Sequence, residues 1–179
     1  MPIYNFDRNI IEVLAHDEQP NPSFTESDKL TVIYKADSII TCIATIKDAA
    51  YNLEDSSSIE GSRLFVCVDN YVLCLQLPNL ELVWSTEVDE ATCFSLHKLE
   101  DDFITRGELC IARIDKNGNI KWQFRGADIF LNLNDDDTPE LEIKSDHLSL
   151  TDFNGTKYKV GFDGTLLYDN YGKQKSPTR

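Results

Sequence analysis

The feature that most constrains the fold is a two-residue alternation of apolar and polar side chains along nearly the whole chain. Segments such as 29–36 (KLTVIYKA) and 63–68 (RLFVCV) are rich in β-branched and aromatic residues, which favour strands. Three dipeptides that tolerate the positive φ of hairpin turns follow later: Asn117-Gly118, Asn154-Gly155 and Asp163-Gly164. The sequence therefore predicts an all-β protein, more than 40% strand, with mostly local antiparallel connections.

One hairpin pattern occurs more than once. Aligning residues 72–85 (VLCLQLPNLELVWS) with residues 109–123 (LCIARIDKNGNIKWQ) superposes Trp84 on Trp122, 38 positions apart. A weaker third copy, YKVGFDGTLLYD, has Tyr168 in place of tryptophan. Each copy offers an apolar ridge that a single hairpin cannot bury, so successive sheets must cover each other. Both tryptophans are predicted to occupy equivalent, largely buried places.

The pattern consists of alternating strand residues, then a turn with Asp or Asn and Gly, and then apolar–x–Trp. It resembles the repeat of pyrroloquinoline-quinone-type β-propellers. The resemblance covers residues 62–125 and, more faintly, 147–169. It implies blade-like repeated hairpins or meanders, as a small propeller or an open β-meander stack, and a β-sandwich also fits. The period of about 40 residues allows about four blades. The cofactor-site motif and adjacent cysteine pair of the quinone enzymes are missing, so no catalytic residue is carried over.

The chain length of 179 residues predicts a single all-β domain over residues 1–179. Only residues 7–16 and 46–54 are candidates for short helices. The composition marks two loops and a frayed, basic tail: residues 15–29, 52–62 and 170–179.

Cysteine usage and hydropathy predict a soluble cytoplasmic protein with no membrane contact. The five cysteines lie in apolar runs, are odd in number and form no CxxC pair, which predicts buried thiols rather than disulfides or a zinc site. No apolar run approaches the roughly 18 residues that cross a bilayer. The first residues, MPIYNFDRNIIEV, lack the regions of a signal peptide.

The charge is strongly acidic and uneven. The chain has 31 acidic and 17 basic residues, a net charge of −14. Residues 48–97 hold nine acids and one base (−8), and residues 126–143 hold six acids and no base (−6). Such a field repels a phosphate backbone, which argues against direct binding of nucleic acid. The acids either keep the protein soluble or match a basic protein partner.

Catalytic motifs are missing. The sequence has no GxSxG elbow, P-loop or dinucleotide fingerprint, and its three histidines are widely separated. DKNGN at 115–119 begins like a calcium loop but lacks the later ligands. We therefore expect no enzyme activity, no cofactor and no metal. The alternative is a hydrolase or small-ligand-binding β-protein with an unrecognised site.

The partner hypothesis follows from the acidity. A small acidic protein without catalytic motifs suits an immunity protein, an inhibitor that covers a basic toxin domain such as a nuclease by mimicking nucleic-acid charge. Phe130 is expected to add an exposed aromatic anchor. The predicted partner-contacting acids are Glu87, Asp89 and Glu90 in the first acidic segment and Asp135, Asp136, Asp137, Glu140 and Glu142 in the second.

Overall fold

The described part of the chain contains sixteen strands. The computed structural model describes residues 3–6, 9–16, 29–36 and 39–47 as strands, and residues 55–132 and 138–170 with their side chains. The strands are β1 (Ile3–Phe6), β2 (Asn9–His16), β3 (Lys29–Ala36), β4 (Ile39–Lys47), β5 (Ser57–Glu60), β6 (Arg63–Val68), β7 (Tyr71–Gln76), β8 (Glu81–Glu87), β9 (Cys93–Leu99), β10 (Asp102–Gly107), β11 (Ile111–Ile114), β12 (Ile120–Phe124), β13 (Leu141–Ile143), β14 (Leu148–Thr151), β15 (Lys157–Val160) and β16 (Leu166–Asp169). They account for about half of the chain, which confirms the expected strand content.

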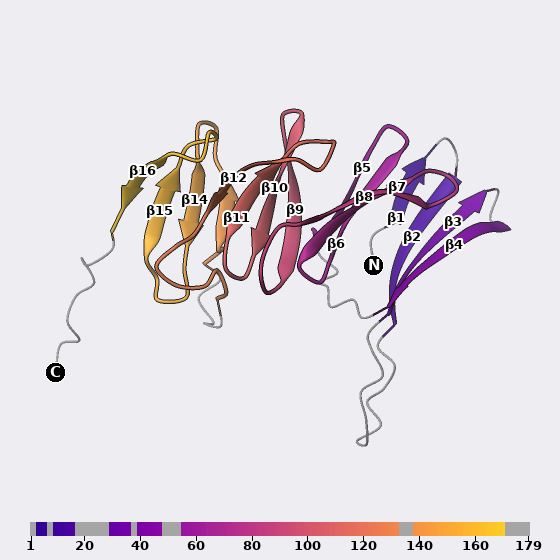
Figure 1. Ribbon diagram of the computed structural model, residues 1–179, viewed down its shortest axis with the longest axis horizontal. Helices are drawn as coiled ribbons and strands as arrows, with labels where there is room; N and C mark the ends of the chain where they lie inside the picture. The colour runs from indigo at the N-terminus through magenta and orange to yellow at the C-terminus, as the bar shows by residue number, and fades with distance from the viewer. Residues whose placement is uncertain are drawn as a thin grey trace, which may run out of the picture.

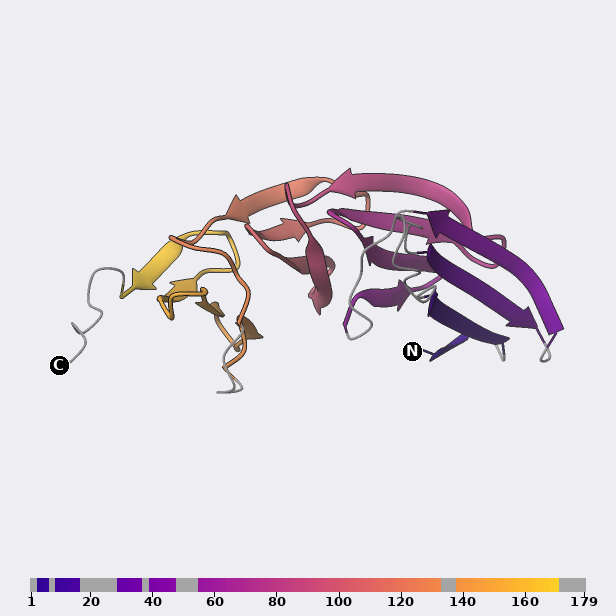
Figure 2. The same ribbon diagram turned by 90° about the horizontal axis from the view of Figure 1, so that it is seen from below.

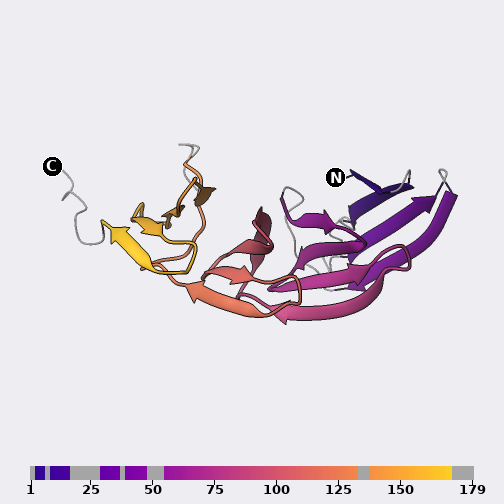
Figure 3. The same ribbon diagram turned by 90° about the horizontal axis from the view of Figure 1, so that it is seen from above.

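The strands form four antiparallel sheets, each of four consecutive strands. Sheet 1 contains β1–β4, sheet 2 β5–β8, sheet 3 β9–β12 and sheet 4 β13–β16. They follow one another in chain order (Figure 1) along an open arc. Figures 2 and 3 show the first strand of each sheet toward the concave side and the last toward the convex side. The all-β prediction is confirmed, and the four blade-like sheets are arranged as an open row.

Some predicted local structure is wrong. Strand β2 occupies most of the expected helix at 7–16, and β4 extends to Lys47 in the expected helix at 46–54. The expected loop at 52–62 contains β5, because its serine-rich segment pairs with β6 from Ser57 opposite Val66 to Glu60 opposite Arg63. Residues 17–28 and 171–179, within the other predicted loop and the tail, lie outside the described residues.

Apolar side chains fill the spaces between successive sheets. One cluster lies between sheets 2 and 3 and includes Phe65, Val72 and Phe103. A second lies between sheets 3 and 4 and includes Ile104, Ile111 and Leu148. The four cysteines whose side chains are described are buried free thiols, as the sequence predicted: Cys67, Cys74, Cys93 and Cys110. Sheets 2 and 3, and likewise sheets 3 and 4, thus supply each other with the cover that a lone hairpin lacks.

Trp84 joins sheet 2 to sheet 3. Its indole Nε1 donates a 3.2 Å hydrogen bond to the carbonyl oxygen of Lys116, in the β11–β12 turn. The ring lies on Gly118, where an added Cβ would come within 2.8 Å of the indole. Gly118 also has a φ of +85°, so this turn needs glycine for its backbone and for the ring above it.

Trp122 repeats that contact between sheets 3 and 4. Its Nε1 donates a 2.9 Å hydrogen bond to the carbonyl oxygen of Phe162. An added Cβ at Gly164, where φ is +86°, would come within 2.7 Å of the indole. The prediction that the two tryptophans are equivalent is confirmed. The prediction that they are largely buried is also confirmed, since both pack against the apolar clusters, although each lies on the last strand of its sheet and keeps part of its ring exposed.

Replacing Trp122 with alanine should lower the free energy of unfolding by about 2–3 kcal/mol, less than for a fully buried indole. Trp122→Phe keeps an aromatic ring on Gly164 but loses the hydrogen bond and part of the packed ring surface, so about 1–2 kcal/mol is expected for it. Urea denaturation of both variants measures the difference. Equal losses for Phe and Ala would show that ring packing contributes little.

Candidate interaction surface

The basic side chains are largely engaged in ion pairs. Residues 55–132 and 138–170 contain 19 acids and 10 bases, a net charge of −9. Eight of those bases lie within 4 Å of a carboxylate: Lys98, Arg106, Arg113, Lys116, Lys121, Arg125, Lys144 and Lys159. The charges that are not already paired within the described part, and so can bind a partner, are therefore mainly negative.

A surface hollow of about 340 Å³ lies between sheets 2 and 3. It borders β8 and β12, the last strands of these sheets, which lie toward the convex side (Figure 2). We call it the rim hollow, and its lining residues are Glu87, Asp89, Glu90, Ile120, Gln123 and Arg125. The acids come from the end of β8 and the segment after it, and the others from β12 and the residue that follows it. Two exposed carboxylates, Glu87 and Glu90, and the Arg125 guanidinium thus line the hollow, and Ile120, which is 39% exposed, adds an apolar wall.

Hydrogen bonds fix the acids of the rim hollow. Asn70 Nδ2 donates to Glu87 Oε1 at 3.0 Å and to the carbonyl oxygen of Asp89 at 3.1 Å. Arg125 Nη2 contacts Glu90 Oε1 at 2.5 Å, and both side chains are more than half exposed. Glu87 is exposed as well. The predicted partner-contacting residues Glu87 and Glu90 are therefore close together and accessible.

The prediction that Asp89 contacts a partner is wrong. Asp89 is only 2% exposed, because its carboxylate folds inward to accept backbone N–H bonds. Oδ1 accepts from Ala91 at 2.7 Å, and Oδ2 accepts from Leu109 at 3.0 Å and Cys110 at 2.8 Å. An added Cβ at Gly107 would lie 2.1 Å from Oδ2. Asp89 therefore anchors the β10–β11 connection of sheet 3 to the end of sheet 2.

The prediction that Phe130 contacts a partner is also wrong. Phe130 was expected to be an exposed anchor, but it is fully buried in the apolar cluster between sheets 3 and 4. Its ring lies 6.3 Å from that of Tyr158, centroid to centroid. A backbone hydrogen bond from its N–H to the carbonyl oxygen of Glu108 fixes this inward placement.

The acids of the second segment lie apart from the rim hollow. Glu140 is half-buried, accepts a hydrogen bond from the Asn132 N–H and lies 3.8 Å from Arg106. Glu142 is exposed and pairs with Lys144 at 2.9 Å. Glu140 directly precedes β13 and Glu142 lies in it, and β13 is the first strand of sheet 4. The rim hollow, in contrast, borders β8 and β12, the last strands of sheets 2 and 3. Asp135, Asp136 and Asp137 lie outside the described residues.

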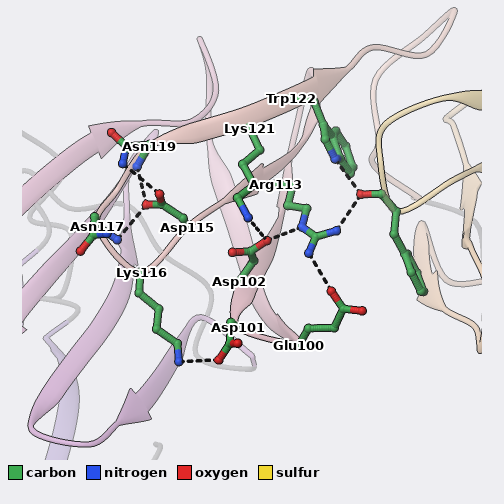
Figure 4. A network of polar contacts seen from close by, with 11 residues as sticks. Glu100, Asp101, Asp102, Arg113, Asp115, Lys116, Asn117, Asn119, Lys121 and Trp122 are labelled. Carbon is green, nitrogen blue, oxygen red and sulfur yellow. Dashed lines mark hydrogen bonds and ion pairs between the residues drawn. The ribbon is translucent and has the colours of Figure 1, made fainter.

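A buried ionic network that the sequence did not reveal links sheets 3 and 4 (Figure 4). Asp102 is 3% exposed and accepts from Arg113 Nε at 2.6 Å and Lys121 Nζ at 2.7 Å. Arg113 also donates to Glu100 at 3.0 Å and to the Phe162 carbonyl oxygen at 2.8 Å. Burial acts to raise the pKa of Asp102, but the bonds from Lys121 and Arg113 outweigh it and hold the pKa low.

The other titratable groups of the described part show no convergent reactive site. Burial and the nearby Asp89 charge raise the pKa of the Cys110 thiol to about 12, which keeps it protonated at neutral pH. Burial lowers the pKa of His97, which contacts the Ser95 hydroxyl at 2.8 Å. Among the described residues no group of three His, Cys, Asp or Glu side chains is placed to hold a metal ion. The same residues include no helix long and apolar enough to span a membrane.

Comparisons with known proteins agree on the fold alone. No protein-family model matches the chain, and no curated protein sequence is similar to it. Solved structures do match. BamB from Moraxella catarrhalis superposes with a TM-score of 0.57 at 11% identity, over 94% of this chain and 47% of BamB. The WD40 β-propeller domain of Doa1 gives 0.55 at 10% identity, over 82% of this chain and 51% of that domain.

The computationally designed Ika8 protein is a third match, with a TM-score of 0.53 at 8% identity, over 93% of this chain and 60% of Ika8. The chain thus spans about half the length of BamB and of the Doa1 domain. These likenesses show a propeller-like arrangement of four-stranded sheets, and a fold of this kind carries no particular activity.

Proposed function

We propose that this chain is a non-catalytic interaction module that binds a basic protein through the rim hollow. The observation that carries the proposal is the pair of accessible carboxylates, Glu87 and Glu90, which line one hollow together with the exposed Ile120. A lysine or arginine of the partner can place its charged head between the carboxylates and its aliphatic stem against Ile120. The acidic surplus around the hollow speeds the encounter.

The partner class that best suits this surface is a basic toxin domain such as a nuclease, with the chain acting as its immunity protein in the cytoplasm. A nuclease carries clustered Lys and Arg because it must hold phosphates. Two carboxylates at a fixed spacing offer those side chains the same charge as a phosphate backbone. The tryptophan-on-glycine contacts also support assigning the blades to the pyrroloquinoline-quinone-type repeat, here without a role for the quinone.

Reversal of the two rim charges, Glu87→Lys/Glu90→Lys, is expected to abolish capture of a basic partner from lysate of the source organism. The matched control is Asp101→Lys/Asp146→Lys, which makes the same change in net charge at two exposed acids that do not line the rim hollow. The control should retain the partner that the wild type captures. Equal capture by all three proteins would contradict the assignment of the rim hollow.

The same capture experiment distinguishes this proposal from the alternative, a hydrolase or small-ligand-binding protein. A hydrolase or small-ligand-binding protein needs no basic macromolecule, and its binding site need not include Glu87 or Glu90. The interaction proposal requires a basic protein that binds the wild type and does not bind the Glu87→Lys/Glu90→Lys variant. If no such protein is captured, the proposal fails.

A further inference from the structure

Two cysteine side chains meet between sheets 2 and 3. Cys67 lies in β6, and Cys93 begins β9. The Cys93 Sγ lies 3.1 Å from the Cys67 Sγ, and both residues are fully buried in the apolar cluster between the two sheets. The sulfur atoms of a disulfide are about 2.05 Å apart, so a movement of about 1 Å brings these two to bonding distance.

Backbone hydrogen bonds hold both cysteines in place. The Cys67 N–H donates to the carbonyl oxygen of Ser56 at 2.8 Å, and the Cys93 N–H donates to that of Asp69 at 2.7 Å. Asp69 lies two residues beyond Cys67, in the turn between β6 and β7. The backbone of Cys93 is thus bonded to the end of the strand that carries Cys67. The docking of sheet 3 on sheet 2 therefore brings the two sulfurs together.

Two other buried thiols have different neighbours and serve as comparisons. The Cys110 Sγ donates to the carbonyl oxygen of Val88 at 3.1 Å, and Cys74 lies opposite Trp84 in the register of β7 and β8. Both are as well buried as Cys67 and Cys93. Burial alone therefore does not set the Cys67–Cys93 pair apart, whereas the contact between its two sulfurs does.

We infer that Cys67 and Cys93 form a reversible disulfide, with a low-molecular-weight disulfide such as glutathione disulfide as the oxidant. The thiolate of one cysteine attacks a sulfur of glutathione disulfide and releases one glutathione, which leaves a mixed disulfide on the protein. The thiolate of the second cysteine attacks the protein sulfur of that mixed disulfide and releases the other glutathione. The cysteines together lose two electrons and two protons, and glutathione disulfide takes up both to become two glutathione molecules.

Burial decides when this exchange takes place. A glutathionyl group has no room in the packed cluster that surrounds the two thiols. The hydrogen bond with Cys67 and burial also raise the pKa of the Cys93 thiol, which leaves little of the reactive thiolate in the folded protein. We therefore expect the first step in the unfolded chain and the second as sheets 2 and 3 dock. This inference does not depend on the proposed partner.

Refolding of the full reduced chain from urea, in a buffer where glutathione disulfide exceeds glutathione, tests the inference. The products are alkylated in denaturant and mapped by peptide mass spectrometry. Three of the five cysteines should be alkylated, and a linked peptide should join Cys67 to Cys93. An excess of glutathione during refolding should leave all five open to alkylation. Five alkylated cysteines in the oxidising buffer, or a bond between a different pair, would overturn the inference.

The disulfide should also raise the thermal midpoint of unfolding. It joins residues 26 positions apart, and a closed loop of that size predicts a Tm about 6–12 °C higher for the oxidised protein than for the reduced protein. Cys93→Ala should have the same Tm after refolding in either buffer. The matched variant Cys110→Ala, at another buried thiol, should keep the wild-type difference.

The wild-type peptide map decides the inference even where Cys93→Ala does not fold. An oxidised wild type that is no more stable than the reduced protein would contradict a disulfide that fits between the docked sheets. A Tm difference that persists in a folded Cys93→Ala protein would contradict the assignment of the bond to this pair.

Discussion

Replacing Asp89 with alanine is expected to lower the free energy of unfolding by about 3–5 kcal/mol, since three backbone N–H groups lose their acceptor at once. Those groups belong to Ala91, Leu109 and Cys110. The carboxylate is 2% exposed, so the donors it satisfies lie where water has little access. The loss should appear as a lower urea midpoint.

Its matched control is Glu90→Ala, one residue further along the chain. Glu90 is exposed and makes only a surface ion pair with Arg125, so its removal should change the free energy of unfolding by less than about 1 kcal/mol. An Asp89→Ala protein as stable as the Glu90→Ala protein would show that Asp89 does not hold sheets 2 and 3 together.

The second large effect is expected at Asp102, whose replacement with alanine should cost about 2–4 kcal/mol because it leaves the Arg113 charge partly uncompensated. The Arg113 side chain is only 13% exposed, although it keeps its bonds to Glu100 and to the Phe162 carbonyl oxygen. Asp101→Ala is the matched control, because Asp101 is 94% exposed. That control should unfold at the wild-type urea concentration.

The Asp102 network should also make stability depend on pH. Its pKa is held low in the folded protein, so the unfolded state takes up a proton first as the pH falls. The network therefore contributes fully above the unfolded pKa of about 4, and its contribution is lost as the pH falls through the folded pKa. The difference in unfolding free energy between wild type and Asp102→Ala should be constant from pH 7 to 5 and shrink below pH 4. A difference independent of pH would contradict the ionic network.

The hairpins were predictable because alternation and turn residues act locally. The equivalence of Trp84 and Trp122 followed from their positions after similar turns. The part of each ring that stays exposed could not be predicted, because it depends on whether a strand lies inside a sheet or at its edge. The strand β5 was missed for a related reason, since backbone pairing with β6 stabilises a serine-rich segment that alternation does not mark.

The site residues were partly predictable. Glu87 and Asp89 are two apart and would share one face of a continuous strand. However, β8 ends at Glu87, and the chain then turns, so that Asp89 faces inward while Glu87 stays exposed. Phe130 was expected to be exposed, but residues 128–132 form no strand whose alternation could place its ring, and packing alone decides that the ring is buried. Nothing in the sequence distinguishes buried Asp102 from exposed Asp101.

The most direct test of the proposed function is the association rate with the captured basic partner, measured against ionic strength. The Debye length falls from about 30 Å at 0.01 M salt to about 8 Å at 0.15 M, so a steered encounter should slow at least about tenfold over that range. Glu87→Lys/Glu90→Lys should slow the association further at low salt and flatten its salt dependence, and Asp101→Lys/Asp146→Lys should keep most of the rate and of its salt dependence. Rates that are indifferent to salt and to the rim charges would contradict the proposal and leave the acidity as a device for solubility.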